Sequence, residues 1–442
     1  METYTETNNP HPVEQADRIK TVDMIRGFAL LGILLMNIPG FGINWSVYYD
    51  VLIKGAHNTK DYYTMAAIFS FFDGTMRGLF SMLFGAGMIL FTQNKHEVPG
   101  GPTVTEYYYR RLLLWLVLFG MFNAFILLWF GDILYYYGLC GMLLFVFRKT
   151  NPKWLLIIGF LCISIGMLKS QLDWNETREK RHAYLEAVKL EKEKQKLTDE
   201  QMAARSEWQE IEKRSKPDTS ISNRNLRKMR SGYSTLFPYL TERNADEEIW
   251  GMYNGAWDML CMMFIGMALF GWGFFSNRLS TSTYTMWLLI GYGIGIPIGW
   301  LTFKEGLMIQ FSDFNNYVDH FRVTHQLLYD IRRGLLSVGH ASLLILIYRS
   351  RIVPWLMKAL ANVGQMAFTN YLVQSIICTL FFYGHGLGYY HKLMYHQLYY
   401  VVFAVWILQL IYSSIWLRYF RFGPFEWLWR SLTYWKKQPM KR

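Results

Sequence analysis

Two segments decide the fold: RIKTVDMIRGFALLGILLMN at residues 18–37 and GMFNAFILLWFGDILYYYGLCG at residues 120–141. Both are apolar runs that carry ionisable side chains, Asp23, Arg26 and Asp132, where a membrane helix would carry none. A charged side chain at the centre of a bilayer costs about 2.5–3.5 kcal/mol even on the lenient insertion scales. We therefore expect membrane helices here, with partners for these charges inside the protein.

Apolar stretches of similar length recur along the chain. Hydrophobic residues make up 52% of the sequence, and a bilayer core of about 30 Å needs about 20 helical residues for each crossing. The stretch 62–72 is too short to cross and is expected to lie at an interface or to re-enter. The sequence predicts an all-α polytopic integral membrane protein with ten spans, at about 22–43, 75–93, 109–129, 131–148, 153–170, 255–275, 283–302, 328–348, 365–384 and 397–418.

Lysine and arginine predict the orientation of the spans. Short connections rich in these residues alternate with poor ones, and both termini fall on the rich side, which in bacteria is the cytoplasmic side of the inner membrane. Positive charge beside apolar spans indicates topology and not nucleic-acid binding. The expected units are a cytoplasmic tail (1–21), helices one to five (22–170), an extracytoplasmic insertion (171–250), helices six to ten (251–420) and a basic cytoplasmic tail (421–442).

The insertion 171–250 has as many basic as acidic residues, and many opposite charges lie three or four positions apart. That pattern predicts solvated helices, and Thr198 with Gln201 has the form of a capping box. A solvated hairpin that joins two membrane halves is the simpler interpretation. A lid or an element that recognises an acceptor is the alternative.

Charged pairs occupy the first two spans. Asp23 and Arg26 share one helical face and are expected to form a core charge pair, which either locks the helix in the bundle or binds an anionic group. Asp73 and Arg77 stand at i and i+4 and are expected near a cavity. The small residues that follow, typical of helix packing, are Gly78, Ser81, Gly85 and Gly87.

The third span begins with Arg110 and Arg111 after three tyrosines. Such a pair suits the phosphates of a donor, although it is also an ordinary interfacial anchor. At the other end, the turn before Asp132 is short enough for Asn123 and Asp132 to face one cavity. Asp132 can instead cap the following helix.

Polar residues also enter the later spans. Thr369, Asn370 and Gln374 are too many for a lipid face and are expected to line helix contacts or a cavity. His340 is a candidate base, although a lone histidine in a span is more often a hydrogen-bonded packing residue. No metal site is expected, since neither the histidines nor the four cysteines show ligand spacing.

Several motifs together resemble the YeiB-like family of bacterial inner-membrane proteins, a domain of unknown function numbered 418. They occur in order along the chain, interrupted mainly by the charged insertion. The motifs are RIKTVDMIRGFALLGILLMN, LFSMLFGAG, YYYRRLLLW, LLWFGDILYYYGLCGMLL, VGQMAFTNYLVQSIICTLFFYG and WLRYFRFGPFEWLWRSLTY.

Through its first-span Asp-x-x-Arg-Gly signature, the family is distantly similar to transmembrane acyltransferases that modify sugars and glycans. The resemblance implies acyl transfer without a bound cofactor, from cytoplasmic acyl-CoA to an acceptor in the membrane or outside it. One position departs from the pattern, because many relatives carry a histidine where this chain has Asn123. An amide cannot act as a general base near neutral pH, although it can orient a substrate or hold an oxyanion.

The leading hypothesis is therefore a membrane acyltransferase that acts on an envelope sugar, a lipid or a small metabolite. In that hypothesis Asn123, Asp132 and His340 are the catalytic candidates, and Arg110 and Arg111 meet the donor. A transporter or flippase is the alternative, because Gly-rich interrupted helices would suit one. A non-enzymatic membrane scaffold is the third hypothesis.

Overall fold

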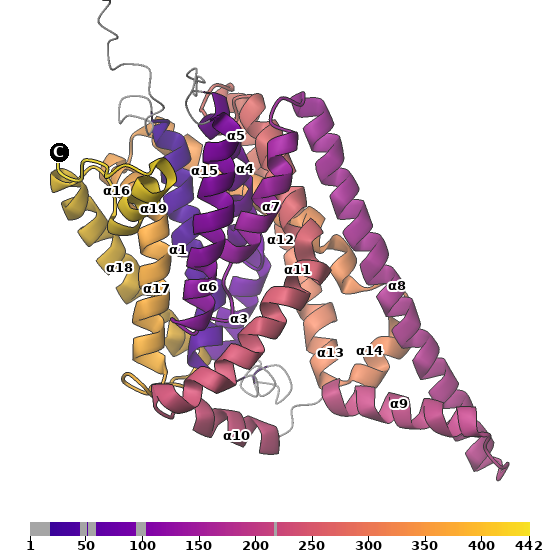
Figure 1. The fold of residues 1–442 in the computed structure, drawn as a ribbon. Coiled ribbons are helices and arrows are strands. Elements are labelled where there is room, and N and C mark those ends of the chain that lie inside the picture. The colour runs from indigo at the N-terminus through magenta and orange to yellow at the C-terminus, as the bar shows by residue number, and fades with distance from the viewer. Residues whose placement is uncertain (1–17, 45–50, 52–58, 94–102, 216–218) are drawn as a thin grey trace, which may run out of the picture.

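The computed structural model describes residues 18–44, 51, 59–93, 103–215 and 219–442 (Figure 1). Within these ranges the regular elements are helices, and the remaining pairing is an isolated bridge between Phe420 and Lys441. The predicted all-α class is confirmed. Most of the predicted tail 1–21 lies outside the described residues.

The described chain can be followed in two parts, the first of which ends with the long helix α8. The helices of the first part are α1 (Lys20–Gly42), α3 (Lys60–Phe71), α4 (Thr75–Gln93), α5 (Val104–Tyr109), the π-helix η2 (Arg110–Leu116), α6 (Val117–Phe125), α7 (Leu134–Val146) and α8 (Pro152–Lys192). The second part contains α9 (Asp199–Ser215), α10 (Thr219–Met229), α11 (Tyr233–Gly271), α12 (Thr281–Leu301), η3 (Thr302–Leu307), α13 (Met308–Ser312), α14 (Phe314–His320), η4 (His325–Leu328), α15 (Tyr329–Ser350), α16 (Pro354–Gln365), α17 (Ala367–Phe382), α18 (Tyr395–Tyr419) and α19 (Pro424–Tyr434).

Six of the described helical stretches are long and apolar enough to cross a bilayer, and a seventh results if the two parts of α11, bent by 58°, form one span. The six are Lys20–Gly42, Lys60–Gln93, Pro152–Lys192, Thr281–Ser312, Tyr329–Ser350 and Tyr395–Tyr419. Two shorter apolar helices, α7 and α17, accompany them. The protein is therefore a polytopic membrane protein, and the count of ten spans stays a prediction.

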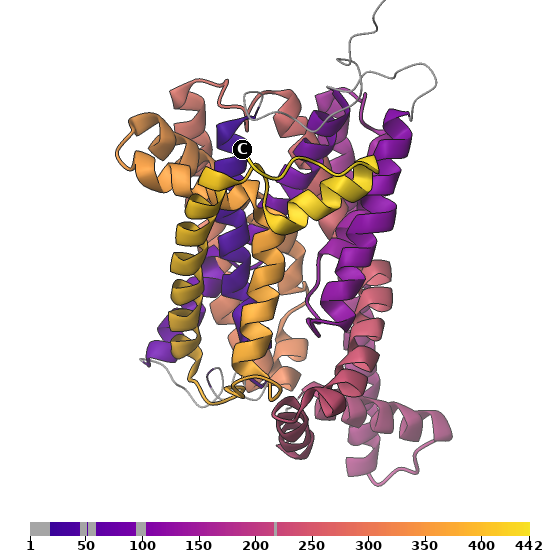
Figure 2. The ribbon, with the colours of Figure 1, turned by 60° about the vertical axis from the view of Figure 1, so that its left-hand side comes forward.

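Burial separates central from peripheral helices. Of the most apolar 18 residues of α1, 72% are buried inside the protein. The corresponding share is 22% in α8 and in the stretch Thr281–Ser312 that begins with α12. Figures 1 and 2 show α1 inside the bundle and α8 along its outer side. Apolar side chains on a peripheral membrane helix can face lipid tails. The exposed apolar side chains of α8 therefore do not require another protein element to cover them.

The stretch 62–72, expected to lie at an interface or to re-enter, belongs to a helical stretch, Lys60–Gln93, that continues through α4. The turn between α3 and α4 keeps helical hydrogen bonds, from Phe72 N to the Ile68 oxygen at 2.9 Å and from Thr75 N to the Phe72 oxygen at 3.0 Å. Gly74 has φ +67°, and a Cβ there would strike the Tyr329 hydroxyl. Glycine therefore permits both the turn and the close approach of α15.

The insertion is helical, as its composition predicts. Gln201 Oε1 accepts from Thr198 N at 2.9 Å and Thr198 Oγ1 accepts from Gln201 N at 3.3 Å, which confirms the capping box. Arg181 on α8 forms a two-point ion pair with Asp319 on α14 at 2.9 and 2.8 Å. That hydrogen-bonded guanidinium lowers the pKa of the Asp319 carboxyl. The second half of α8 therefore contacts α14, in the segment that follows α12, as well as α9.

Glycines allow two pairs of helices to touch through their backbones. A Cβ on Gly27 of α1 would fall on the Leu360 oxygen of α16, and one on Gly364 of α16 would fall on the Asp23 oxygen. The α4–α11 crossing has the same reciprocal form, with Gly85 against Met263 and Gly266 against Met82. The predicted role of the small residues of α4 in packing therefore applies to Gly85.

We expect Gly85→Ala to destabilise the protein by about 1–3 kcal/mol, because the added methyl group meets backbone that cannot rotate away. Gly87→Ala is the matched control on the same helix, since a Cβ there meets nothing within 4 Å. Thermal unfolding of the detergent-solubilised variants measures both. Equal midpoints for the two variants would contradict the close α4–α11 crossing.

Both described ends of the chain lie at the same end of the bundle. Figures 1 and 2 place α19 and the C-terminus beside the start of α1, with α9 and α10 at the far end. The α6–α7 turn stops part-way along the bundle, above the first half of α11, where the Tyr233 hydroxyl donates to the Ile126 oxygen at 3.0 Å. The middle of the protein therefore holds a turn enclosed by helices.

Candidate functional site

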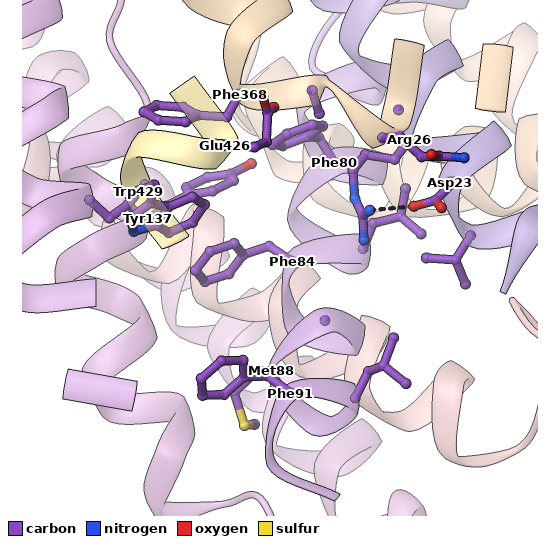
Figure 3. A pocket seen from close by; sticks show the side chains of 18 of the residues that line it. Asp23, Arg26, Phe80, Phe84, Met88, Phe91, Tyr137, Phe368, Glu426 and Trp429 are labelled. Carbon is purple, nitrogen blue, oxygen red and sulfur yellow. Dashed lines mark hydrogen bonds and ion pairs between the residues drawn. The ribbon is translucent and has the colours of Figure 1, made fainter. Parts of the chain in front are cut away.

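A cavity of about 250 Å³ lies among α1, α4, η2, α7, α17 and α19. Its wall combines residues from both ends of the sequence, as Figure 3 shows for Asp23 of α1 and Glu426 of α19. The α1–α16 backbone contact supports one side, because Gly364 lies in the wall and touches the Asp23 carbonyl. The cavity is thus formed only when the two parts of the chain pack together.

Part of the wall is strongly basic. Asp23 accepts from Arg26 at 2.8 Å and from Arg18 at 3.0 Å, so Asp23 and Arg26, the residues of the predicted core pair, are in contact and a third residue joins them. Among the described residues, Arg111 and Arg430 form no ion pair with a carboxylate. The ionisable residues of this end are Arg18, Arg26, Arg111, Arg430, Asp23 and Glu426.

Arg111 and Arg430 are held by aromatic rings. The guanidinium carbon of Arg111 lies 4.3 Å from the centre of the Trp429 ring, and that of Arg430 lies 4.5 Å from the Phe422 ring. Burial and the positive charges of Arg18 and Arg111 lower the pKa of Arg430 to about 9. Crowded cations without matching carboxylates favour an anionic ligand.

Glu426 does not neutralise these arginines by direct contact. Its carboxylate accepts from the Thr369 backbone nitrogen at 2.9 Å and from the Thr369 hydroxyl at 2.5 Å. Thr369 therefore lies directly behind the cavity and positions a side chain that lines it.

The predicted arginine pair separates in the structure. Arg111 lines the cavity, whereas Arg110 pairs with Glu106 one helical turn earlier and stacks on Trp435 at 5.8 Å. The two side chains therefore have different neighbours, although they are consecutive in η2. Of the two candidate donor contacts, only Arg111 lies in the cavity wall.

The remaining wall is apolar and aromatic. Phe80, Phe84 and Met88 follow one face of α4, and Phe368 faces them from α17 (Figure 3). The spacing of the α4 residues, four apart, places them in one row. A ligand with an anionic group and an apolar portion would match the two kinds of wall.

At Tyr371 the cavity reaches the turn between α6 and α7. The Tyr371 hydroxyl accepts from Ile133 N at 3.1 Å and lies 3.3 Å from Asp132 Oδ1, to which it donates. Asp132 also accepts from Asn123 Nδ2 at 2.7 Å and from Tyr135 N at 2.9 Å. Asn123 and Asp132 thus meet, and Asp132, one residue before the N-cap Ile133, also binds a backbone N–H of the first turn of α7.

His340 lies elsewhere. Its Nδ1 is 2.5 Å from the Tyr292 hydroxyl, its Nε2 is 3.1 Å from the Phe71 oxygen, and it is 4% exposed. It is not among the residues that line the cavity. Because both ring nitrogens are engaged, His340 has the geometry of a packing histidine.

Asn370 and Gln374 also lie outside the cavity wall. Gln374 donates to Gln409 at 3.0 Å, and Asn370 donates to the Ser413 hydroxyl at 3.1 Å. These amides form a polar seam between α17 and α18, one of the two places that their sequence pattern allowed.

Asp73 and Arg77 do not pair with each other. Asp73 binds Arg332 at 2.6 Å, and Arg77 binds Asp258 at 2.9 Å, while Asp258 also binds Arg333 at 2.6 Å. Their partners come from α11 and α15, which also pack on α4, so tertiary contacts replace the local i, i+4 pair.

This ion cluster holds six charges that balance: Asp73, Arg77, Asp258, Asp330, Arg332 and Arg333. Arg332 and Arg333 are each 1% exposed. Sequence reasoning missed both, although an Arg-Arg pair inside an apolar span is itself a signal. None of the six residues lines the cavity, so the cluster stabilises the packing of α4, α11 and α15.

No group of three or more metal-ligating side chains occurs in the described ranges. His396 pairs with Asp61 at 2.6 Å on the bundle surface. Sequence reasoning also overlooked Tyr371, Glu426 and Arg430. Glu426 and Arg430 stand four apart in an aromatic helix, which was the available signal.

Helical spans around an internal cavity define the class as a polytopic α-helical membrane protein. Residues 269–436 match the family model described as Protein of unknown function (DUF418). The chain is 30% identical over 424 residues to "Uncharacterized protein YeiB" of Escherichia coli (strain K12), with 94% of this chain and 96% of the relative covered. The chain therefore belongs to the YeiB-like DUF418 family.

Two further relatives also match over almost their whole length. "Uncharacterized protein YxaH" of Bacillus subtilis (strain 168) is 29% identical, with 98% of both chains covered. "Uncharacterized 39.9 kDa protein in amylase 3'region" of Bacillus acidopullulyticus is 24% identical, with 97% of both covered. No solved structure matches the chain.

Proposed function

We propose that this protein is a membrane acyltransferase whose donor, an acyl-CoA thioester, binds in the cavity. The observation that carries the proposal is the contrast between the arginine end of the wall and its apolar remainder. Phosphates suit arginine because the guanidinium offers several fixed hydrogen-bond donors. The thioester and acyl portion would lie along Phe80, Phe84 and Met88.

The reaction takes place beside Tyr371, where the cavity meets the Asp132 turn. An acceptor hydroxyl oxygen forms a bond to the acyl carbonyl carbon, and the carbon–sulfur bond of the thioester breaks. Asp132 takes the hydroxyl proton and returns it to the leaving thiolate, which yields the free thiol of CoA and an acyl ester. Asn123 orients the carboxylate, and the Tyr371 hydroxyl holds it on the cavity side.

The proposal places the arginine end at the cytoplasmic face of the bacterial inner membrane, with both termini there. The Lys/Arg asymmetry of the connections supports this orientation. The acceptor, an envelope sugar, a lipid or a small metabolite, reaches Asp132 from the opposite side. Acyl-CoA is a substrate in this scheme, and the chemistry needs no resident cofactor.

Donor binding should depend on Arg111 and not on Arg110. We expect Arg111→Ala to weaken the binding of labelled acetyl-CoA to solubilised protein by about 10–100-fold, because a charged hydrogen bond contributes about 1.5–3 kcal/mol. Arg110→Ala is the matched control, since Arg110 stacks outside the cavity and pairs with Glu106. Added salt should weaken binding to the wild type more than to Arg111→Ala.

Two results would contradict the proposal. Equal losses of acetyl-CoA affinity in Arg110→Ala and Arg111→Ala would show that the cavity does not recognise the donor. Substrate-driven flux in liposomes without a covalent product would show that the protein is a transporter instead.

A further inference from the structure

A row of buried polar side chains runs along the first part of α11, facing the α6–α7 turn. Thr241, Asn244 and Glu248 stand three and four residues apart, so they share one helical face. Asn244 is 0% exposed and Glu248 is 4% exposed. Asn244 Nδ2 donates to the Ala124 oxygen of α6, which fixes this face against the residue that follows Asn123.

These side chains carry oxygen atoms with no hydrogen-bond partner: Thr241 Oγ1, Asn244 Oδ1 and both carboxylate oxygens of Glu248. Asn123 Oδ1, on the α6 residue next to Ala124, is also without a partner. Buried polar atoms in folded proteins are nearly always paired, so a group of them at one place needs a physical reason. A bound ligand supplies one.

The chemistry of the group indicates what it would bind. Amide and carboxylate oxygens only accept hydrogen bonds, so the unpartnered atoms of the row are acceptors apart from the Thr241 hydroxyl, which can also donate. Glu248 also interacts electrostatically with Asp132 and, within the described residues, forms no ion pair with a lysine or arginine. Carboxylates without cations and with few donors suit a ligand that brings several hydroxyl groups.

We infer that Thr241, Asn244 and Glu248, together with Asn123, form a binding site for a hydroxyl-rich, sugar-like compound on the side of Asp132 opposite the basic cavity. The inference rests on the proposed function only in naming this compound the acyl acceptor. One of its hydroxyl groups would then point at Asp132. The half of α11 that carries the site lies toward α10, at the far end of the bundle from the termini (Figure 1).

The test uses the full-length solubilised protein with glycerol, glucose and glucosamine as probes. At least one probe should raise the thermal midpoint of the wild type, and this rise should disappear in Glu248→Leu and Asn244→Leu. Glu247→Gln is the matched control, because Glu247 is the exposed neighbour on the same helix and should respond like the wild type. General stabilisation by sugars acts on all variants and cancels in the comparison.

Without a probe, Glu248→Leu should be at least as stable as the wild type, because it removes a buried carboxylate that has no partner. A lower midpoint for Glu248→Leu than for the wild type would show that the carboxylate already has a structural partner and would overturn the inference. So would the absence of any probe-induced rise in the wild type, or a rise that persists in both leucine variants.

The two proposals fail separately. If the wild type binds acetyl-CoA but its thermal midpoint responds to no probe, the sugar site is contradicted and the donor cavity is not. A wild type that responds to a probe but binds no acetyl-CoA keeps the sugar site and removes acyl transfer.

Discussion

Asp132→Asn should lower the rate of acyl transfer by about 10²–10⁴-fold, the range over which a positioned general base contributes. The asparagine keeps the shape of the side chain and one acceptor oxygen for Asn123 and Tyr371. It cannot take up the proton of the acceptor hydroxyl. Turnover of labelled acetyl-CoA with a saturating acceptor, at matched amounts of protein, measures the loss.

Two controls separate chemistry from folding, since Asp132 also binds the first turn of α7 through Tyr135. Binding of acetyl-CoA should remain, because the arginine end of the cavity is untouched. Asn123→His, which places an imidazole beside Asp132, should preserve or raise the rate. Full turnover by Asp132→Asn with unchanged donor binding would exclude Asp132 as the proton carrier.

The second large effect concerns folding. Asp258→Leu should cost about 3–5 kcal/mol, because Arg77 at 2.9 Å and the buried Arg333 at 2.6 Å would lose their shared carboxylate. The yield of monodisperse protein and its thermal midpoint report the loss. The double variant Asp258→Leu, Arg77→Met should recover part of it, since one of the two stranded cations is also removed.

The matched control is an exposed pair. Glu210 and Arg214 lie 3.5 Å apart with side chains 61% and 83% exposed, so Glu210→Ala should change stability little. A similar loss for Glu210→Ala and Asp258→Leu would mean that burial does not decide the strength of these pairs.

Much of the fold follows from local sequence. The apolar runs predict the long helices α1, α8, α15 and α18, and the spacing of Thr198 and Gln201 predicts a capping box that the structure confirms. Local periodicity cannot show where a helix stops inside the bundle. The sequence predicts crossings at 109–129 and 131–148, and the turn between the corresponding helices lies part-way along the bundle, above the first half of α11.

Local sequence also cannot show which residue a charged side chain will pair with. Asp73 and Arg77 satisfy the i, i+4 rule, but Asp73 binds a residue 259 positions away. The sequence draws attention to Arg111 and Asp132 because a charge in an apolar run is visible in one segment. Glu426 and Arg430 were missed because they become cavity residues only when α19 packs over the cavity, which the local sequence does not show.

The positions of the charged side chains in the cavity depend on the close backbone contact of α1 and α16 at Gly27 and Gly364. The Asp23 carbonyl rests on Gly364, and the Asp23 carboxylate holds Arg18 and Arg26. Any motion that separates α1 from α16 must therefore shift the Asp23 anchor of both guanidinium groups. A small rocking of one helix would change the positive field at the cavity.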